Sequence, residues 1–457
     1  MNCSENILGT EKIWKLLLRM GLPGLAAQLI NLLYNLVDRI YIGHIPEMGS
    51  VALSGVGLTM PILEIISAFS ALVGNGGAPL ASIAMGMGDK ERAERILGNG
   101  TVLLLFLSAV LTALFMAIRR PFLYMVGASD ASYPYAEQYI VIYLTGTVFV
   151  QLSLGLNPFI SAQGQAKTAM LSTVIGAVIN IILDPIFIFA LNMGVRGAAL
   201  ATVISQFASA LWIVIYLTRP GTSLHIRRSC LKPERKIIKS ILALGVSPFT
   251  MSATNSLIVV VLSRELSIYG GAAGDLHVAA LAILQSVMQL IFIPLHGFTG
   301  GAAPIISYNY GAGKSGRVRE TVKKMLAAGV GYSFLISLLA VLFPEMFGRM
   351  FSSNEELIAL VKRVLPIFIM GMFIFGAQCV CQTVFTSTGQ AGRSMLVAML
   401  RKVILLAPLA VIFPAVSGNV MSIYWAEPVS DIISVTACLL IFADFVRKSG
   451  FRMPDLR

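Results

Sequence analysis

The sequence predicts an all-α integral membrane protein with twelve transmembrane helices, in two parallel, pseudo-symmetric six-helix bundles with a central cleft. Composition is the first reason: 56% of the 457 residues are hydrophobic and only 12% are charged, whereas about 25% of the residues in a soluble domain are charged. The second reason is a series of apolar runs long enough to cross a bilayer. The third is an internal repeat that divides the chain into two halves.

Each predicted membrane helix is a run of about 20 or more mainly apolar residues. Because the number of helices is even, we expect both termini on one side of the membrane. The predicted helices cover residues 14–43, 51–86, 92–118, 132–157, 168–190, 194–217, 236–269, 277–308, 317–343, 357–385, 393–414 and 420–447.

Basic residues are distributed unevenly between the two sides of the predicted bundle. Most of the 34 Lys and Arg lie in the termini and in the loops on the same side, which by the positive-inside rule is the cytoplasmic side. The formal charge of +12 therefore reflects membrane topology, and we expect no nucleic acid partner. The opposite loops hold few basic residues: Arg119, Arg120, Arg196, Arg349, Lys362 and Arg363.

The two halves match at a constant offset of 225 residues, without a gap, along residues 23–171 of the first half. Parallel repeats of this kind are a transporter architecture, with the substrate site between the halves. We therefore expect an N-terminal six-helix lobe at 1–218, a basic cytoplasmic linker at 219–239 and a C-terminal six-helix lobe at 240–457. The matched positions include Pro23 with Pro248, Gly86 with Gly311, Gly146 with Gly371, and Gly164 with Gly389.

A polar stripe runs along the first membrane helix and includes the acid Asp38. Polar residues at steps of three and four share one helix face, which cannot be turned toward lipid. A hydrogen bond between helices, with Arg39 at the interface, would explain Asp38 alone, but the whole stripe favours a watery cavity. We predict that Asp38 binds the coupling ion of a transporter. The stripe comprises Gln28, Asn31, Tyr34, Asn35, Asp38 and Tyr41.

The fifth helix carries a second acid. Asn180 and Asp184 are four residues apart and face the same way. Pro185 has no N–H, so it frees a carbonyl and bends the helix beside Asp184. Thr202, on the sixth helix, can complete an oxygen-rich ion site with Asp38, Asn180 and Asp184, although threonine in a membrane helix is a weak signal by itself.

Other polar or soft side chains are candidates for the wall of the cavity. Glu64 lies in the second helix, and Gln289 matches it at the repeat offset. A core position is the simpler interpretation of Met288, although methionine would suit a large apolar cation. The predicted cavity or substrate residues are Gln28, Asn31, Tyr34, Asn35, Glu64, Gln285, Met288 and Gln289.

The second half lacks the acids of the first. The repeat aligns Asp38 with Ser263 and Asp184 with Leu409, so we expect ion coupling in the first half, and packing and substrate contacts from the second. Arg401, inside the eleventh helix, is predicted to pair with Glu427 or Asp431 of the twelfth as a structural contact.

Two buried carboxyl groups can serve either of two coupling ions. They can share and release a proton, or both can stay ionised and hold Na⁺ with amide and hydroxyl oxygens. Both alternatives remain open from the sequence. We expect no other cofactor, no resident metal and no enzymatic activity, because the histidines (His44, His225, His277, His296) show no ligand spacing and the glycine-rich segments do not fit a phosphate loop.

Several segments resemble the multidrug and toxin extrusion (MATE) transporters, most closely the bacterial branch with DinF-like and MepA-like exporters. The resemblance covers nearly the whole chain and implies two six-helix lobes with a central cleft, and export of cationic, lipophilic compounds in exchange for H⁺ or Na⁺. Carried over by position, it implies an ion site at Asp38, Asn180, Asp184 and Thr202. The segments include LYNLVDRIYIGH (33–44), ASIAMGMGDKERAERILGN (81–99), NPFISAQGQ (157–165), GAVINIILDPIFIF (176–189) and YNYGAGKSGRVRETVKK (308–324).

We therefore expect a multi-pass antiporter of a bacterial plasma membrane, with cytoplasmic termini, that works as a monomer on small cationic, lipophilic substrates. The nearest alternative is a flippase for lipid-linked oligosaccharides from the same superfamily. Such a protein would need a strongly cationic cavity for pyrophosphate. A channel would have no need of an ion site confined to one half of the chain.

Overall fold

The computed structural model describes residues 7–45 and 49–451. Within these residues helices dominate and no strand forms, since the only β-type contact is an isolated bridge between Pro220 and Thr222. The predicted all-α class is confirmed. In this chain a helix is the natural membrane element, because it satisfies its own backbone hydrogen bonds in lipid.

We name the helices before the central connection the first lobe. It follows a short N-terminal helix, α1 (Ile7–Thr10). Its elements are α2 (Ile13–Gly43), α3 (Gly49–Gly57), α4 (Met60–Gly86), α5 (Lys90–Val126), α6 (Tyr133–Thr145), α7 (Thr147–Ala162), α8 (Ala166–Pro185), the π-helical turn η1 (Ile186–Ala190) and α9 (Val195–Thr218).

The helices after the central connection form the second lobe. The connection itself contains the short 3₁₀ helix η2 (Arg228–Leu231). The lobe comprises α10 (Arg235–Gly270), η3 (Gly271–Ala273), α11 (Gly274–Gly311), α12 (Ser315–Leu342), α13 (Pro344–Phe351), α14 (Glu355–Phe368), η4 (Met370–Ile374), α15 (Phe375–Ser387), α16 (Ala391–Met399), η5 (Leu400–Leu406), α17 (Ala407–Ser417), η6 (Val420–Trp425) and α18 (Ala426–Ser449).

The helices account for the twelve predicted membrane crossings. Ten stretches of the described residues are long and apolar enough to span a membrane, and the bent pair α6 and α7 makes an eleventh. One of the ten, Ile258–Gly311, contains the end of α10 and the whole of α11. Counting that stretch as two crossings gives the expected twelve.

Two predicted helices are wrong in detail, since η4 also interrupts the helix predicted over 357–385. The sequence predicts an uninterrupted helix over 132–157, but the chain bends by 59° between α6 and α7, at Gly146. Gly146 lies against α9, where a Cβ atom would come within 2.6 Å of Val203. Its repeat partner Gly371 lies in η4, and a Cβ there would be 2.4 Å from the Cβ of Asp431. At both breaks the chain comes close to another helix. Hydropathy along the sequence cannot predict such a contact.

The repeat found in the sequence is also visible in the structure. Corresponding helices begin or end at residues 225 positions apart, and two pairs of matched glycines adopt left-handed backbone angles. Only glycine adopts that conformation without a steric cost. The pairs are the ends of α4 and α11 (Gly86, Gly311), the starts of α8 and α16 (Ala166, Ala391), and the left-handed glycines Gly88 with Gly313 and Gly164 with Gly389.

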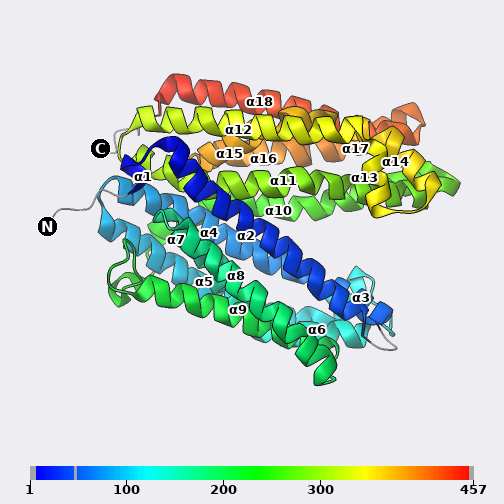
Figure 1. Cartoon of the computed structure of the whole chain (residues 1–457), viewed down its shortest axis with the longest axis horizontal. Coiled ribbons are helices and arrows are strands. Elements are labelled where there is room, and N and C mark those ends of the chain that lie inside the picture. The colour runs from blue at the N-terminus through cyan, green and yellow to red at the C-terminus, as the bar shows by residue number, and fades with distance from the viewer. Residues whose placement is uncertain (1–6, 46–48, 452–457) are drawn as a thin grey trace.

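The two lobes meet most closely at the end that carries the termini. Figure 1 shows both chain ends on that side, and the first-lobe helices slope away from the second lobe toward the opposite end. Near the termini, a Cβ on Gly86 would lie 2.1 Å from the carbonyl oxygen of Tyr308, and a Cβ on Gly311 would lie 2.1 Å from that of Ile83. These two contacts are related by the repeat, so matched helices seal this end.

Helix α1 bridges the lobes at the same end. The Leu8 carbonyl accepts a hydrogen bond from Asn309 (2.8 Å), and the Glu11 carbonyl accepts one from Arg317 (2.7 Å). On its other side α1 contacts the first lobe, because Leu8 lies beside Gly164. Helix α1 and the adjoining Glu11 therefore cover the closed end of the interface.

The connection between the lobes is held against the first lobe. Glu94, buried at the start of α5, pairs with Arg227 (3.1 Å) and lies 3.3 Å from His225. The Gln163 side chain accepts a hydrogen bond from the Leu224 backbone (3.0 Å). The basic connection thus follows one face of the first lobe.

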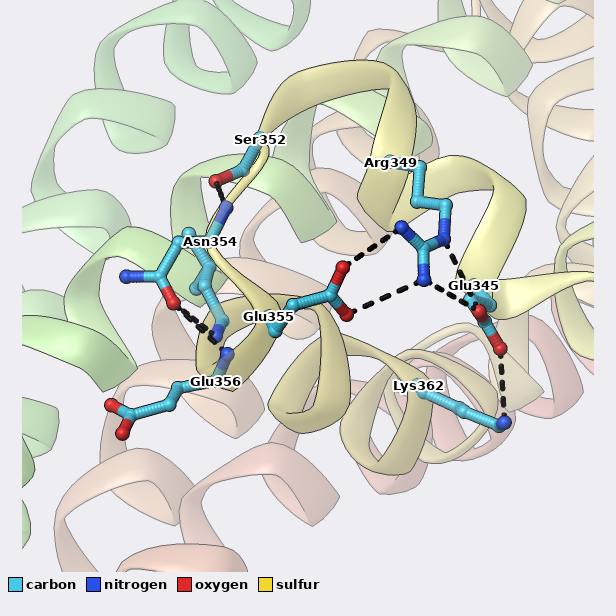
Figure 2. A network of polar contacts seen from close by, with 8 residues as sticks. Glu345, Arg349, Ser352, Asn354, Glu355, Glu356 and Lys362 are labelled. Atoms are coloured by element: carbon cyan, nitrogen blue, oxygen red, sulfur yellow. Dashed lines mark hydrogen bonds and ion pairs between the residues drawn. The ribbon is translucent and has the colours of Figure 1, made fainter.

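An exposed polar network holds α13 and α14 together at the far end of the second lobe (Figure 2). Arg349 bridges Glu345 (3.1 Å) and Glu355 (3.0 Å), and Lys362 binds the other oxygen of Glu345 (3.0 Å). Asn354 caps α14 by accepting hydrogen bonds from the backbone N–H groups of the first turn. Hydrogen bonds from Lys362 and Arg349 hold the pKa of the Glu345 carboxyl below its ordinary value.

We expect the cap to contribute more stability than the ion pairs of this network. A lowered pKa means that any stabilisation by Glu345 is present at neutral pH and is lost as the pH falls through that lowered pKa. Exposed ion pairs contribute little, however, so Glu345→Gln should leave the melting temperature at pH 7 unchanged. Asn354→Ala should cost about 1 kcal/mol because it removes an N-cap. Thermal unfolding of the purified variants measures both, and a greater loss in Glu345→Gln would contradict this ranking.

Candidate functional site

The two acids of the first lobe face each other in its interior. Asp38 on α2 and Asp184 on α8 are both buried, and their carboxyl groups are close enough to interact electrostatically. Asn180 donates to Oδ1 of Asp184 (3.2 Å), as their spacing of four predicts. Oδ1 of Asp38 and Oδ2 of Asp184 have no hydrogen-bond partner among the described residues. The pair can therefore accept one shared proton or a small cation.

Two tyrosine side chains lie near this pair of acids. Tyr34 interacts electrostatically with both acids, and Tyr139 with Asp38. The Thr202 side chain lies within hydrogen-bonding range of Tyr139, while its hydroxyl donates to the Ala198 carbonyl of its own helix (3.0 Å). Thr202 therefore makes no hydrogen bond to either acid among the described residues.

Pro185 shapes the helix beside Asp184. It is the last residue of α8, and the chain continues as the π-helical turn η1. Proline removes one backbone donor, and a π turn is a common way to accommodate an irregular helix near a functional site. Asp184 therefore sits where the regular hydrogen-bonding pattern of its helix ends.

A cavity of about 290 Å³ opens within the first lobe, next to these residues. Three members of the predicted stripe line it, Gln28, Asn31 and Tyr34, whereas Asp38 lies beyond Tyr34 on the same helix. The rest of the wall is rich in small hydroxyl and amide groups. These are Ser67 and Asn75 on α4, Ser153 and Asn157 on α7, Ser172 and Thr173 on α8, and Ser205, Gln206 and Ser209 on α9.

A second cavity, of about 590 Å³, lies between the lobes. Gln28, Asn75 and Asn157 line both cavities, so the two adjoin. Second-lobe residues, including Gln382, form the other wall. His296 is the only basic side chain in the lining, and no Asp or Glu is among the described residues that form it. The central cavity is thus polar and nearly uncharged, and the acids lie off to one side, within the first lobe.

The structure separates the remaining predicted residues from these cavities. Asn35 is exposed and donates to the carbonyl of Asn31 in its own helix (2.8 Å). Glu64 and Gln289 are also exposed, and Gln285 is half-buried. Met288 is buried in the apolar core of the second lobe. None of these five residues lines either cavity.

Several residues at the site were missed by sequence reasoning. Asn157 donates to the hydroxyl of Ser172 (2.7 Å) and to the carbonyl of Ala169 (2.8 Å), which ties α7 to α8 across the cavity wall. Tyr139 and His296 were also missed. Asn157 stands beside Pro158 in an apolar run, and a polar side chain at such a point was the signal available. His296 offered no comparable pattern.

The sequence comparisons identify the family. The model described as MatE matches residues 23–186 and 252–412, in both lobes and over most of the chain. The chain belongs to the MatE family. The membership expected from the motifs is confirmed, and with it a multi-pass membrane protein.

Relatives of this MatE protein include exporters from staphylococci. The chain is 25% identical over 428 residues to the multidrug export protein MepA of Staphylococcus haemolyticus, covering 93% of each chain. It is 24% identical over 431 residues to MepA of Staphylococcus aureus strain MSSA476, covering 94% of this chain and 93% of the relative.

Solved structures share the fold of this MatE protein. One is the outward-facing conformation of a MATE family transporter, with a TM-score of 0.88 and 21% identity, covering 98% of this chain and 99% of that one. Another is a MOP superfamily transporter from Pyrococcus furiosus, with a TM-score of 0.89 and 22% identity, covering 99% and 100% of the two chains. At these identities the likeness concerns the fold.

Proposed function

We propose that this MatE protein is a secondary active multidrug exporter. It expels cationic, lipophilic compounds in exchange for H⁺ or Na⁺. The observation that carries the proposal is the buried Asp38–Asp184 pair beside a polar cavity, which adjoins the larger cavity between the lobes. Ionisable groups buried in a membrane protein are costly and mark ion pathways. The name of the staphylococcal relatives, multidrug export protein MepA, supports the same substrate class.

Ion binding and substrate binding can oppose each other in this arrangement. Gln28 and Asn31 line the cavity of the first lobe on the helix that carries Asp38. Protonation of the acid pair, or Na⁺ binding to it, removes negative charge beside that cavity. A cationic substrate is then held less strongly, and it is released when the ion enters. This competition couples release of the substrate to binding of the ion, as an antiporter requires.

Alternating access requires the lobes to separate at one end and meet at the other. They now meet at the end of the termini, through the matched contacts of Gly86 and Gly311. The basic residues concentrate at that end, so we assign it to the cytoplasm. The state described is then closed to the cytoplasm. We place the protein in a bacterial plasma membrane as a working monomer, with both termini cytoplasmic.

The flippase alternative is less well supported. A pyrophosphate-linked substrate would need several cationic side chains in the cavity, because phosphate recognition relies on Arg and Lys. Among the described residues that line the central cavity, His296 is the only basic one. The exporter is therefore the better match to this lining.

Efflux under separate ion gradients tests the proposal. Ethidium-loaded cells or inverted vesicles that contain the protein are given a proton gradient and a sodium gradient in turn, and dye loss is followed by fluorescence. We expect one of the two gradients to drive efflux, which also identifies the coupling ion. If neither gradient moves the dye, the exporter proposal fails and the flippase becomes the leading candidate.

A further inference from the structure

The second lobe contains a buried charged cluster that the proposed function does not use. Arg401 in η5 donates from Nε to Oδ1 of Asp431 (2.6 Å) and from Nη2 to Oε1 of Glu427 (3.1 Å). All three side chains are almost completely inaccessible. The pairing predicted from the sequence is confirmed, and Arg401 binds both acids of α18 rather than one of them.

Aromatic rings complete the enclosure of the guanidinium group. Its central carbon lies 4.6 Å from the ring centre of Phe375 and 5.4 Å from that of Phe292. Cation–π contacts of this kind are strongest when the cation is desolvated. The cation is thus held by carboxylates along its edge and by rings over its faces.

The repeat relates this cluster to the cavity of the first lobe. The starts of α9 (Val195) and η6 (Val420) are also 225 positions apart, which extends the offset beyond residue 171. At this offset, Arg401 corresponds to Gly176, and Asp431 to Gln206. Both Gly176 and Gln206 line the first-lobe cavity. Glu427 corresponds to Thr202, a residue of the proposed ion site. The charged cluster therefore lies in the second lobe where the first lobe has its polar cavity and one side of its ion site.

We propose that Arg401 is a resident cation that fills the second-lobe counterpart of the ion-binding region. Glu427 and Asp431 form a site for a guanidinium-type cation, and the protein's own side chain occupies it permanently. The second lobe then exchanges no ion during transport, and coupling is confined to Asp38 and Asp184. This inference rests on the proposed function for its coupling consequence, but the binding site itself does not depend on transport.

The surroundings of Asp431 also fit a binding site for a cation. Oδ2 of Asp431 is buried and has no hydrogen-bond partner among the described residues. Asp431 also packs directly against Gly371, where no side chain could be accommodated. The backbone of η4 thus brings the carboxylate close to the guanidinium, and removal of the arginine side chain would leave two acids facing an empty volume.

Guanidinium binding to an arginine-deleted variant tests the site. We would purify full-length Arg401→Ala and measure its melting temperature with increasing low concentrations of guanidinium chloride, against sodium chloride at the same ionic strength. We expect Arg401→Ala to melt at a lower temperature than the wild type. Its melting temperature should then rise, to saturation, with guanidinium and not with sodium. The wild type, and the Arg401→Met, Glu427→Gln, Asp431→Asn triple variant, should show no such rise. Absence of a guanidinium-specific rise in a folded Arg401→Ala variant would overturn the proposal.

The triple variant gives a second, independent test if Arg401→Ala does not fold. It removes the charges of Arg401, Glu427 and Asp431 together, so none of these three is left buried without its partner; Lys402, which also interacts electrostatically with both acids, is kept. We expect it to retain ion-driven ethidium efflux, with the same number of ions exchanged per substrate as the wild type. A reduced ion stoichiometry would mean that the second lobe does exchange an ion, and would overturn the proposal. If the wild type shows no ion-driven efflux, the proposed function fails, whereas the guanidinium measurement still decides the binding site.

Discussion

Asp38→Asn is expected to abolish ion-driven efflux while the protein still folds and inserts. Asparagine keeps the size of the side chain but can neither take up a proton nor carry a negative charge. Asp38 lies against Asp184, so the substitution also removes a conflict between two buried carboxyl groups and should not destabilise the lobe. We expect ethidium efflux to fall at least about tenfold, which corresponds to a loss of about 1.4 kcal/mol in the coupled step.

Two further variants make this experiment specific. Asp184→Asn should weaken coupling too, because it removes the other half of the pair. Glu356→Gln is the control, since this exposed acid lies at the start of α14, outside both cavities. Equal protein levels in the membrane are checked by immunoblot. Normal gradient-driven efflux by a well-expressed Asp38→Asn variant would exclude Asp38 from coupling.

Gly86→Ala is expected to prevent the lobes from closing at the end of the termini. A Cβ atom at this position would lie 2.1 Å from the backbone oxygen of Tyr308, and a backbone atom cannot be moved as a flexible side chain can. Gly86 ends α4 with a negative φ that alanine also adopts, so we attribute the expected loss to the contact between lobes. We expect efflux to fall at least about tenfold. We also expect the central cavity to become accessible from the end of the termini.

Side-specific labelling measures that shift. Thr383 lines the central cavity, so Thr383→Cys in a background without native cysteines reports which end is open to a membrane-impermeant maleimide. In the Gly86→Ala background the label should enter from the side of the termini. Gly331→Ala is the matched control, because Gly331 lies within α12 and a Cβ there would contact nothing within 4 Å. Unchanged sidedness in Gly86→Ala would show that this contact does not hold the lobes closed.

The sequence predicted best the features that depend on neighbours along one helix. Asn180 and Asp184 face the same way because they are four residues apart, and they form a hydrogen bond. The pairing of Arg401 with acids of the last helix was also predictable, because a charge buried in a membrane needs a partner. In the first example helix geometry decides which side chains meet, and in the second the need to pair a buried charge decides it.

Features that depend on where the lobes meet could not be predicted in this way. Asn35 shares the helix face of Gln28, but it lies about two turns further along α2 and is exposed. Figure 1 shows that α2 slopes away from the second lobe in this direction. Helical periodicity gives the direction of a side chain and not the depth of a cavity. The break at Gly146 was missed for a similar reason, since the close approach of Val203 involves a helix far away in the sequence.

The Arg401 cluster also has a consequence for biogenesis. Arg401 precedes both of its partner acids in the chain, and they lie on the last helix, α18. An arginine at the centre of an inserting helix costs about 3 kcal/mol, and the chain reaches the membrane from its N-terminus. The segment Ala391–Ser417 therefore gains a stable place only when α18 arrives. We expect these two segments to enter the bilayer together as a hairpin, so that assembly of the second lobe waits for the synthesis of α18.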